Sequence, residues 1–233
     1  MYQDFFGLDG EPFHITPDPR FFFLSPSHRE SLAAIAYGVK NRKGFIAVTG
    51  EVGTGKTTVV RTFLEKYGGP GMKTVLVYNA NITFANLLEI IFAELDLEPE
   101  ANDQFRRVQQ LHRHLIDLYG RGQTVVLIID EAQNMPVRTL ENLRMLSNLE
   151  TTRDKLLQII LVGQPELDSL LERRELRQLK QRLAVRTRLA PLTPAESLQY
   201  IRFRLQKAGG TLKGTFTKGA LKKIIEYAGG IPR

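Results

Sequence analysis

The sequence contains no cysteine and no tryptophan, and it has only four histidines. The absence of cysteine excludes disulfide bonds and every metal site that uses thiolate ligands. His112 and His114 lie two positions apart in a segment of helical periodicity, so their side chains leave different faces. The sequence therefore contains no zinc-binding pattern, and a cysteine-free chain fits a reducing compartment such as the cytoplasm.

Long apolar runs are also missing. The aliphatic run Val125–Ile129 is five residues long, whereas a membrane-spanning helix needs about 20 apolar residues. The start, MYQDFFGLDG, lacks the basic residues and the small-residue cleavage site of a secretory signal. We therefore expect a cytoplasmic protein, and its 233 residues suit one large domain with a smaller appendage.

The net charge of +7 is unevenly distributed. Residues 172–233 hold fifteen basic and four acidic residues, a net charge of +11, whereas residues 1–171 carry −4. A basic region of this kind could bind nucleic acid or an anionic membrane. It could equally be a solvated face, or a contact between subunits that meets phosphates. Charge alone does not choose among these interpretations.

Five apolar segments alternate with segments of helical periodicity. The most aliphatic of them have the pattern of strands that are buried on both faces of a sheet. Strands that are separated by long helices pair in parallel through right-handed crossovers. We therefore predict an α/β fold with a parallel five-stranded sheet flanked by helices. The strands are expected at residues 44–50, 73–79, 124–130, 156–163 and 184–192.

Two capping boxes mark helix starts beside this pattern. Glu30 follows Ser27 by three positions, and Glu196 follows Thr193 in the same way, with Pro194 between them. Proline suits the first position of a helix, because the N–H that it lacks would have no partner there. We expect one helix to begin at Ser27 and a smaller helical domain to begin after Thr193.

The stretch GEVGTGKTT fits the phosphate-binding pattern G-x-x-x-x-G-K-[ST] between a strand and a helix. Its glycines let consecutive backbone N–H groups turn toward phosphate oxygens, and the start of the helix faces the same anion. Lys56 can reach the β- and γ-phosphates, and the Thr57 hydroxyl can ligate Mg²⁺. The predicted nucleotide-binding residues here are Gly50, Glu51, Val52, Gly53, Thr54, Gly55, Lys56, Thr57 and Thr58.

Polar side chains follow two of the predicted strands. Asp130 and Glu131 end one strand, and Gln164 ends another, at the edge where parallel sheets bind ligands. Asp130 is expected to hold Mg²⁺ opposite Thr57. Glu131 is expected to polarise the water that attacks the γ-phosphate. The tip of Gln164 is expected beside Asp130, near that water. The motifs together favour hydrolysis over storage of the nucleotide.

Several arginines are candidates for completing the site. Arg182 lies too far along the fold to face its own nucleotide, so we expect it to reach the γ-phosphate of a neighbouring subunit, as an arginine finger does. Arg233, in GGIPR, could return from the helical domain to the same phosphates. The arginines that compete with Arg182 are Arg173, Arg174, Arg177, Arg186 and Arg188.

These motifs resemble those of AAA+ ATPases, with Walker A at 50–57, Walker B at 125–131, sensor 1 at Gln164 and sensor 2 at Arg233. Within that superfamily the chain is similar to the ExeA/GspA-type ATPases of the general (type II) secretion pathway. The stretches that carry this resemblance are FFGLDGEPFHITPDPRFFFLSPSHRE and GFIAVTGEVGTGKTT. Related patterns occur in pilus-associated, exopolysaccharide-associated and DNA-transposition ATPases. Many AAA+ proteins have Asn where this chain has Gln164.

The resemblance implies ATP and Mg²⁺ as cofactors and an ATP-dependent homo-oligomer, a ring or a filament. It implies an N-terminal segment and helix on the adenine side at 1–43, a nucleotide-binding domain at 44–190 and an incomplete helical lid at 191–233. In this family, ATP turnover is linked to the assembly of a bacterial envelope secretion machine. The resemblance therefore also implies a place at the cytoplasmic face of the inner membrane and a membrane partner protein.

The run Phe21–Leu24 lies between prolines and is too short to cross a membrane. In AAA+ proteins the segment before the first helix of the domain lies against the adenine base. The resemblance thus predicts that Phe23, Leu24 and Ser25 line the adenine pocket, with Tyr37 as a further candidate.

Three functional hypotheses follow from the sequence. The leading one is an oligomeric ATPase that couples turnover to assembly of an envelope secretion machine. The second is an ATP-dependent DNA-binding regulator of the transposition type, which the basic region at 172–233 favours. The third is a nucleotide-gated switch that barely hydrolyses ATP.

Overall fold

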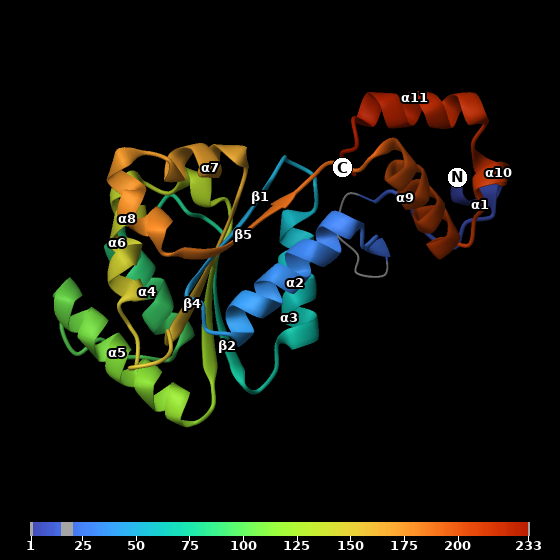
Figure 1. The fold of residues 1–233 in the computed structure, drawn as a ribbon. Coiled ribbons are helices and arrows are strands. Elements are labelled where there is room, and N and C mark those ends of the chain that lie inside the picture. The colour runs from blue at the N-terminus through green and yellow to red at the C-terminus, as the bar shows by residue number, and fades with distance from the viewer. Residues whose placement is uncertain (1, 15–20, 233) are drawn as a thin grey trace.

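The computed structural model describes residues 2–14 and 21–232 (Figure 1). At its centre is a sheet of five strands in the order β2-β3-β4-β1-β5, and every neighbouring pair is parallel. This arrangement confirms the predicted parallel five-stranded sheet. The strands are β1 (Phe45–Gly50), β2 (Met72–Val77), β3 (Thr124–Ile129), β4 (Leu157–Gly163) and β5 (Leu183–Leu189).

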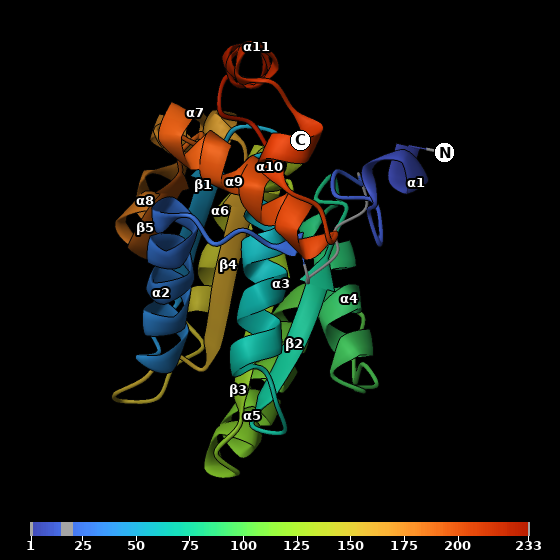
Figure 2. The same cartoon turned by 90° about the vertical axis from the view of Figure 1, so that its right-hand side faces the viewer.

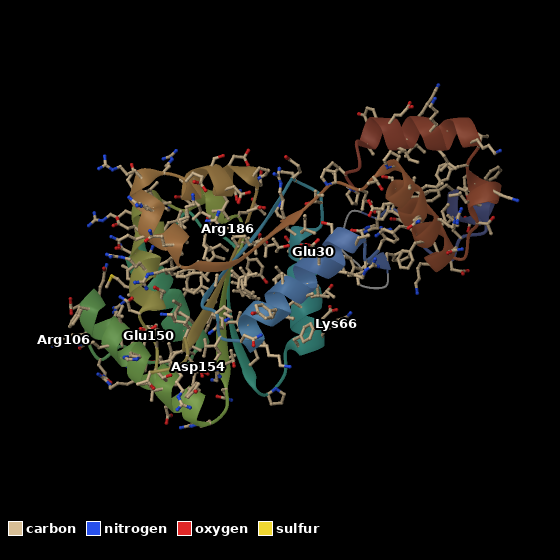
Figure 3. The ribbon with its side chains drawn as sticks, viewed as in Figure 1. Glu30, Lys66, Arg106, Glu150, Asp154 and Arg186 are labelled. Atoms are coloured by element: carbon tan, nitrogen blue, oxygen red, sulfur yellow. The ribbon has the colours of Figure 1, made fainter. Side chains whose placement is uncertain are left out.

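Helices cover both faces of the sheet (Figures 1 and 2). Figure 3 shows Lys66 of α3 and Arg106 of α5 on opposite sides of it. Buried side chains alternate along β3: Val126 and Ile128 pack with α2 and α3, whereas Leu127 packs with the helices of the other face. One face carries α2 (Pro26–Lys40) and α3 (Lys56–Tyr67), and the other carries α4 (Phe84–Glu94), α5 (Gln104–Gly120), α6 (Val137–Ser147), α7 (Pro165–Leu171) and α8 (Arg177–Gln181).

The strand register brings the predicted site residues to one edge of the sheet. Thr49 near the end of β1 is paired with Gly163 at the end of β4, and Ile129 at the end of β3 is paired with Leu161. The segments that follow these three strands therefore leave the sheet at the same edge, which we call the carboxyl edge. Because all five strands are parallel, their loops converge there.

A smaller lobe is formed by α9 (Pro194–Lys207), α10 (Leu212–Thr215) and α11 (Lys218–Ala228) together with α1 (Tyr2–Phe6) (Figures 1 and 2). Leu8 packs against its core, and the N–H of Asp9 donates to the carbonyl of Ala208 at 2.8 Å. The grouping of residues 1–43 on the adenine side stays a prediction. Leu8, Asp9 and Phe13 contact the C-terminal helices, and we call α1, the segment that follows it to residue 14, and these helices together the lobe.

Two helix starts can be compared with the capping boxes in the sequence. The box at Thr193 and Glu196 is present at the start of α9, which confirms that prediction. The predicted start at Ser27 is wrong, because α2 begins at Pro26 and is capped by Ser25, whose hydroxyl accepts from the N–H of His28. The Ser27 hydroxyl instead accepts from the N–H of Ala190 at 3.0 Å. No helix among the described residues is long and apolar enough to cross a membrane.

Candidate nucleotide-binding site

The phosphate-binding turn leaves β1 at the carboxyl edge and leads directly into α3. Gly53 and Gly55 have φ values of 81° and 96°, a region that favours glycine. A Cβ at Gly55 would also lie 2.8 Å from Nε2 of His28. The shape of the turn therefore requires glycine at position 55 for two independent reasons.

Lys56 is buried at the start of α3, and its ammonium lies inside the turn. Its Nζ donates to the carbonyls of Gly50 at 2.9 Å and Glu51 at 3.1 Å. Burial lowers the pKa of Lys56, and the nearby carboxylates of Glu131 and Asp130 oppose that shift. A cation held in a partly desolvated turn attracts an anion more strongly than one in water.

Thr57 and Asp130 meet across the carboxyl edge. The Thr57 hydroxyl donates to Oδ2 of Asp130 at 3.0 Å, while Oδ1 of Asp130 accepts from the N–H of Glu131 at 2.9 Å. These hard oxygen ligands suit Mg²⁺, which usually takes one or two protein ligands together with waters and phosphate oxygens. Among residues 2–14 and 21–232 there is no cluster of three or more His, Cys, Asp or Glu side chains that could hold a metal.

The Glu131 carboxylate is bound by two glutamine side chains. Its Oε2 accepts from Nε2 of Gln133 at 2.6 Å and from Nε2 of Gln164 at 3.0 Å. Burial raises the pKa of Glu131, but these two hydrogen bonds and the charge of Lys56 outweigh burial and hold the pKa below its usual value. Gln164, expected beside Asp130, therefore contacts the neighbouring residue Glu131. Gln133 was not predicted, although it belongs to the same DEAQ stretch.

A cavity of about 460 Å³ lies between the phosphate-binding turn and the lobe. One side is the turn itself with Glu131, and the other side is largely aromatic. Asp130 and Gln164 do not line the cavity, but each contacts a residue that does. The side away from the turn is lined by Phe13, His14, Phe21, Phe22, Phe23, His28, Leu192, Tyr200, Arg204 and Pro232.

The predicted adenine wall is only partly present in this cavity. Phe23 lines it, and its ring lies 6.0 Å from the ring of Tyr200. Leu24 packs instead with the core below α2 and α3, and the buried side chain of Ser25 caps α2. Tyr37 does not line the cavity: it lies near the far end of α2 and is 55% exposed.

His28 is a site residue that the sequence did not reveal. Its buried ring lies between Ser25 and the phosphate-binding turn, with Nε2 at 2.9 Å from the carbonyl of Thr54 and Nδ1 at 2.6 Å from the Ser25 hydroxyl. The carbonyl can only accept, so Nε2 carries the proton and the Ser25 hydroxyl donates to Nδ1. Burial lowers the pKa of His28, against the hydrogen bond to Thr54 and the charge of Glu196.

Arg204, on α9, was also missed by sequence reasoning. Its guanidinium donates to the carbonyls of Pro12, Phe21 and His14, and it lies 4.9 Å from the centre of the Phe21 ring. The side chain therefore attaches the N-terminal segment to the lobe at the wall of the cavity. No local sequence pattern predicts these contacts, because the carbonyl groups that Arg204 binds belong to residues more than 180 positions away along the chain.

The candidate arginine fingers lie away from this cavity. Arg182 precedes β5, whose first residue is level with Phe45 at the start of β1, so it lies at the edge opposite the phosphate-binding turn. Its guanidinium donates to Ser147 and Asn148 at the end of α6. Arg186 is exposed on β5, as Figure 3 shows, and lies 3.8 Å from a carboxylate oxygen of Glu172. The prediction for Arg233 falls outside the described residues.

The sequence is similar to those of known proteins. A family described as "AAA domain" matches residues 39–171, more than half of the chain. The chain is also 42% identical, over 236 residues, to general secretion pathway protein A of Aeromonas hydrophila. That match covers 100% of this chain and 42% of the relative, so the chain spans less than half the length of that protein.

The fold is also similar to those of solved structures. A Walker-type ATPase of Pyrococcus abyssi superposes with a TM-score of 0.67 at 18% identity, covering 95% of this chain and 68% of that one. Cdc6p of Pyrobaculum aerophilum gives a TM-score of 0.63 at 19% identity, covering 90% and 58%. At these identities the likeness shows the fold alone. Because the family match spans the phosphate-binding turn and the acidic end of β3, the chain belongs to the AAA family of nucleotide-binding ATPase domains.

Proposed function

We propose that this protein binds Mg·ATP in the cavity at the carboxyl edge and hydrolyses it. The observation that carries the proposal is the convergence of Lys56, the Thr57–Asp130 pair and Glu131 on one cavity of about 460 Å³. The turn and Lys56 bind the phosphates, and Thr57 and Asp130 are the residues that would hold Mg²⁺. Bound there, the ion would neutralise charge on the phosphate oxygens.

Each of the remaining polar groups has a role in the proposed hydrolysis. Glu131 orients the attacking water and accepts its proton on Oε1, since Oε2 is engaged by two amides. Gln164 is proposed to hold that carboxylate beside the γ-phosphate. The Phe23 ring, with the backbone at Leu24 and Ser25 behind it, forms the wall on which the base stacks. The lobe then acts as a lid over the nucleotide.

The position of Arg182 supports an oligomeric ATPase. Arg182 lies at the opposite edge of the sheet from its own phosphate-binding turn, where it can serve only a neighbouring subunit. We therefore keep it as the proposed finger in trans, with the exposed Arg186 and Arg188 of β5 as competitors. Members of the AAA+ superfamily are typically oligomeric, which fits a ring or filament of this chain. Arg233 remains a proposed contact to the same phosphates.

The biological role that we propose is the assembly of a bacterial envelope secretion machine. It rests on the match that covers all of this chain and 42% of general secretion pathway protein A. In this proposal the domain works at the cytoplasmic face of the inner membrane with a membrane partner protein. An ATP-dependent DNA-binding regulator is the second candidate, which the exposed arginines of β5 and the +11 charge of residues 172–233 favour.

Two variants test the proposed chemistry. Lys56→Ala should abolish ATP binding, whereas Glu131→Gln should bind ATP and lose at least about 100-fold in kcat. Normal turnover by Glu131→Gln would refute the assignment of the base. A salt titration of DNA binding separates the two candidate roles, because a DNA-coating protein loses ATP-dependent affinity steeply as salt rises. No DNA binding at about 50 mM salt would remove the second candidate.

A further inference from the structure

Gln133 lies in the short 3-10 helix Ala132–Asn134, directly after the strand end that carries Asp130 and Glu131. Both ends of its amide are occupied: Nε2 donates to Oε2 of Glu131 at 2.6 Å, and Oε1 accepts from the N–H of Gln164 at 3.1 Å. One side chain thus bridges the ends of β3 and β4. We propose that Gln133 is a positioning residue that orients the Glu131 carboxylate for water activation and couples it to Gln164.

The backbone at the end of β4 leaves space for the Gln133 amide. A Cβ at Gly163, the last residue of β4, would lie 2.8 Å from Oε1 of Gln133. The same Cβ would lie 2.8 Å from Cδ2 of Leu167. Since Gly163 is not among the residues with positive φ, its lack of a side chain is explained by these two close neighbours, of which the bridging amide is one.

Glu131 itself adopts an unusual conformation that the bridge supports. Its φ of 52° and ψ of 40° lie in the left-handed region, which is strained for a residue other than glycine. Such a conformation persists only when the surroundings hold it. Here the N–H of Glu131 donates to Asp130 and its carboxylate accepts from Gln133 and Gln164, so both ends of the residue are fixed.

The Gln133 side chain does not line the cavity that would receive the nucleotide. In the proposed hydrolysis its loss should therefore lower kcat and leave the affinity for ATP unchanged. A merely structural support would change kcat and the affinity for ATP together.

The inference rests on the proposed function, and the experiment separates the two. The kcat and the affinity for ATP are measured for wild type, Glu131→Gln, Gln133→Met and Gln133→Glu. Gln133→Met keeps the length of the side chain and removes the amide. Gln133→Glu keeps an acceptor for the Gln164 N–H but replaces the donor to Glu131. Gln123→Met is the matched control, because that amide lies at the opposite edge and donates to the carbonyl of Pro70.

We expect kcat to fall roughly 10- to 100-fold in both Gln133 variants, as for a misplaced catalytic group. ATP affinity should stay within about twofold of wild type. Gln123→Met should match wild type. A wild-type kcat in Gln133→Met or Gln133→Glu, or a loss of ATP affinity as large as the loss of kcat, would overturn the inference and leave the proposed function standing.

The other outcomes are equally decisive. If wild type and Glu131→Gln hydrolyse ATP at the same rate, or neither hydrolyses it, the proposed function fails and the inference fails with it. If Gln133→Met does not fold, Gln133→Glu decides, because it retains the bond to the Gln164 N–H. If neither variant folds, Gln133 is required for the fold itself and the positioning role is overturned.

Discussion

The two sides of the candidate site are built in different ways. The phosphate side consists of turns that emerge from strands whose side chains are almost wholly buried between two layers of helices. The base side consists of aromatic rings attached to a lobe whose buried core is small: Ile201, Leu205 and Leu221. The sheet therefore fixes the positions of the residues that would bind the phosphates. The aromatic wall on which the base would stack depends instead on contacts between distant parts of the chain. Perturbing the lobe should therefore spare the phosphate side.

The largest expected effect concerns stability. Leu127→Ala, at a fully buried position of β3, should lower the free energy of unfolding by about 3 kcal/mol, because it leaves a cavity between packed layers. Leu221→Ala, at a position of the lobe that is 8% exposed, should cost about 1–2 kcal/mol. Urea denaturation measures both changes. Equal losses would mean that the sheet and the lobe do not differ in packing as proposed.

His28 tests whether the phosphate side depends on a contact from outside the turn. His28→Ala removes the donor to the Thr54 carbonyl and should weaken ATP binding about tenfold, the equivalent of one buried hydrogen bond. His28→Gln is the matched control, because its amide nitrogen can reach the same carbonyl. Titration with a fluorescent ATP analogue gives both affinities. Unchanged binding by His28→Ala would show that the turn keeps its shape unaided.

Phe23 separates the two sides of the cavity most directly. Phe23→Ala should weaken ATP binding by roughly fivefold or more, because stacking on a base contributes about 1–3 kcal/mol. The same variant should bind inorganic triphosphate as wild type does, since the phosphate side is intact. Tyr37→Ala, an exposed substitution, should leave both affinities unchanged. An equal loss of affinity for ATP and for triphosphate would contradict the proposal that Phe23 contacts only the base.

The smallest effect is a pH dependence of stability. Because burial holds the pKa of His28 below its usual value of 6.5, the folded protein binds this proton less readily than the unfolded chain. The stability contributed by neutral His28 is thus fully present above that value and is lost as pH falls through the lower, folded-state pKa. Between about pH 7 and pH 5, wild type should lose more thermal stability than His28→Gln. Parallel losses would contradict this assignment.

Local patterns in the sequence predicted the sheet, the phosphate-binding turn, and the position of Gln164 at the same edge of the sheet as Asp130 and Glu131. Each depends on residues that are close in the sequence or on strands whose ends must meet at one edge of a parallel sheet. The capping box at Thr193 is local in the same sense. Such patterns determine backbone conformation within a few residues, so they can be recognised without the fold.

The missed features depend on contacts that no spacing encodes. His28 meets Thr54 across 26 positions, and Gln133 bridges to Gln164 across 31. The assignment of residues 2–14 to the lobe depends on Leu8 and Asp9 finding the C-terminal helices. The start of α2 was misplaced because Ser25 and Ser27 are both suitable N-cap residues in the sequence. Ser25 caps the helix, whereas the Ser27 hydroxyl accepts a hydrogen bond from the N–H of Ala190.

The contact between Arg204 and Pro12, 192 residues apart, has a consequence for synthesis on the ribosome. Closing so long a loop is entropically costly, and it must wait until α9 has been made. The strands of the sheet and the turn after β1 emerge earlier and can pack as a unit, because chains fold from the N-terminus as they appear. A nascent chain would thus carry a formed phosphate-binding turn before the wall for the base exists. The chain would therefore be able to bind a whole nucleotide only after α9 has been made.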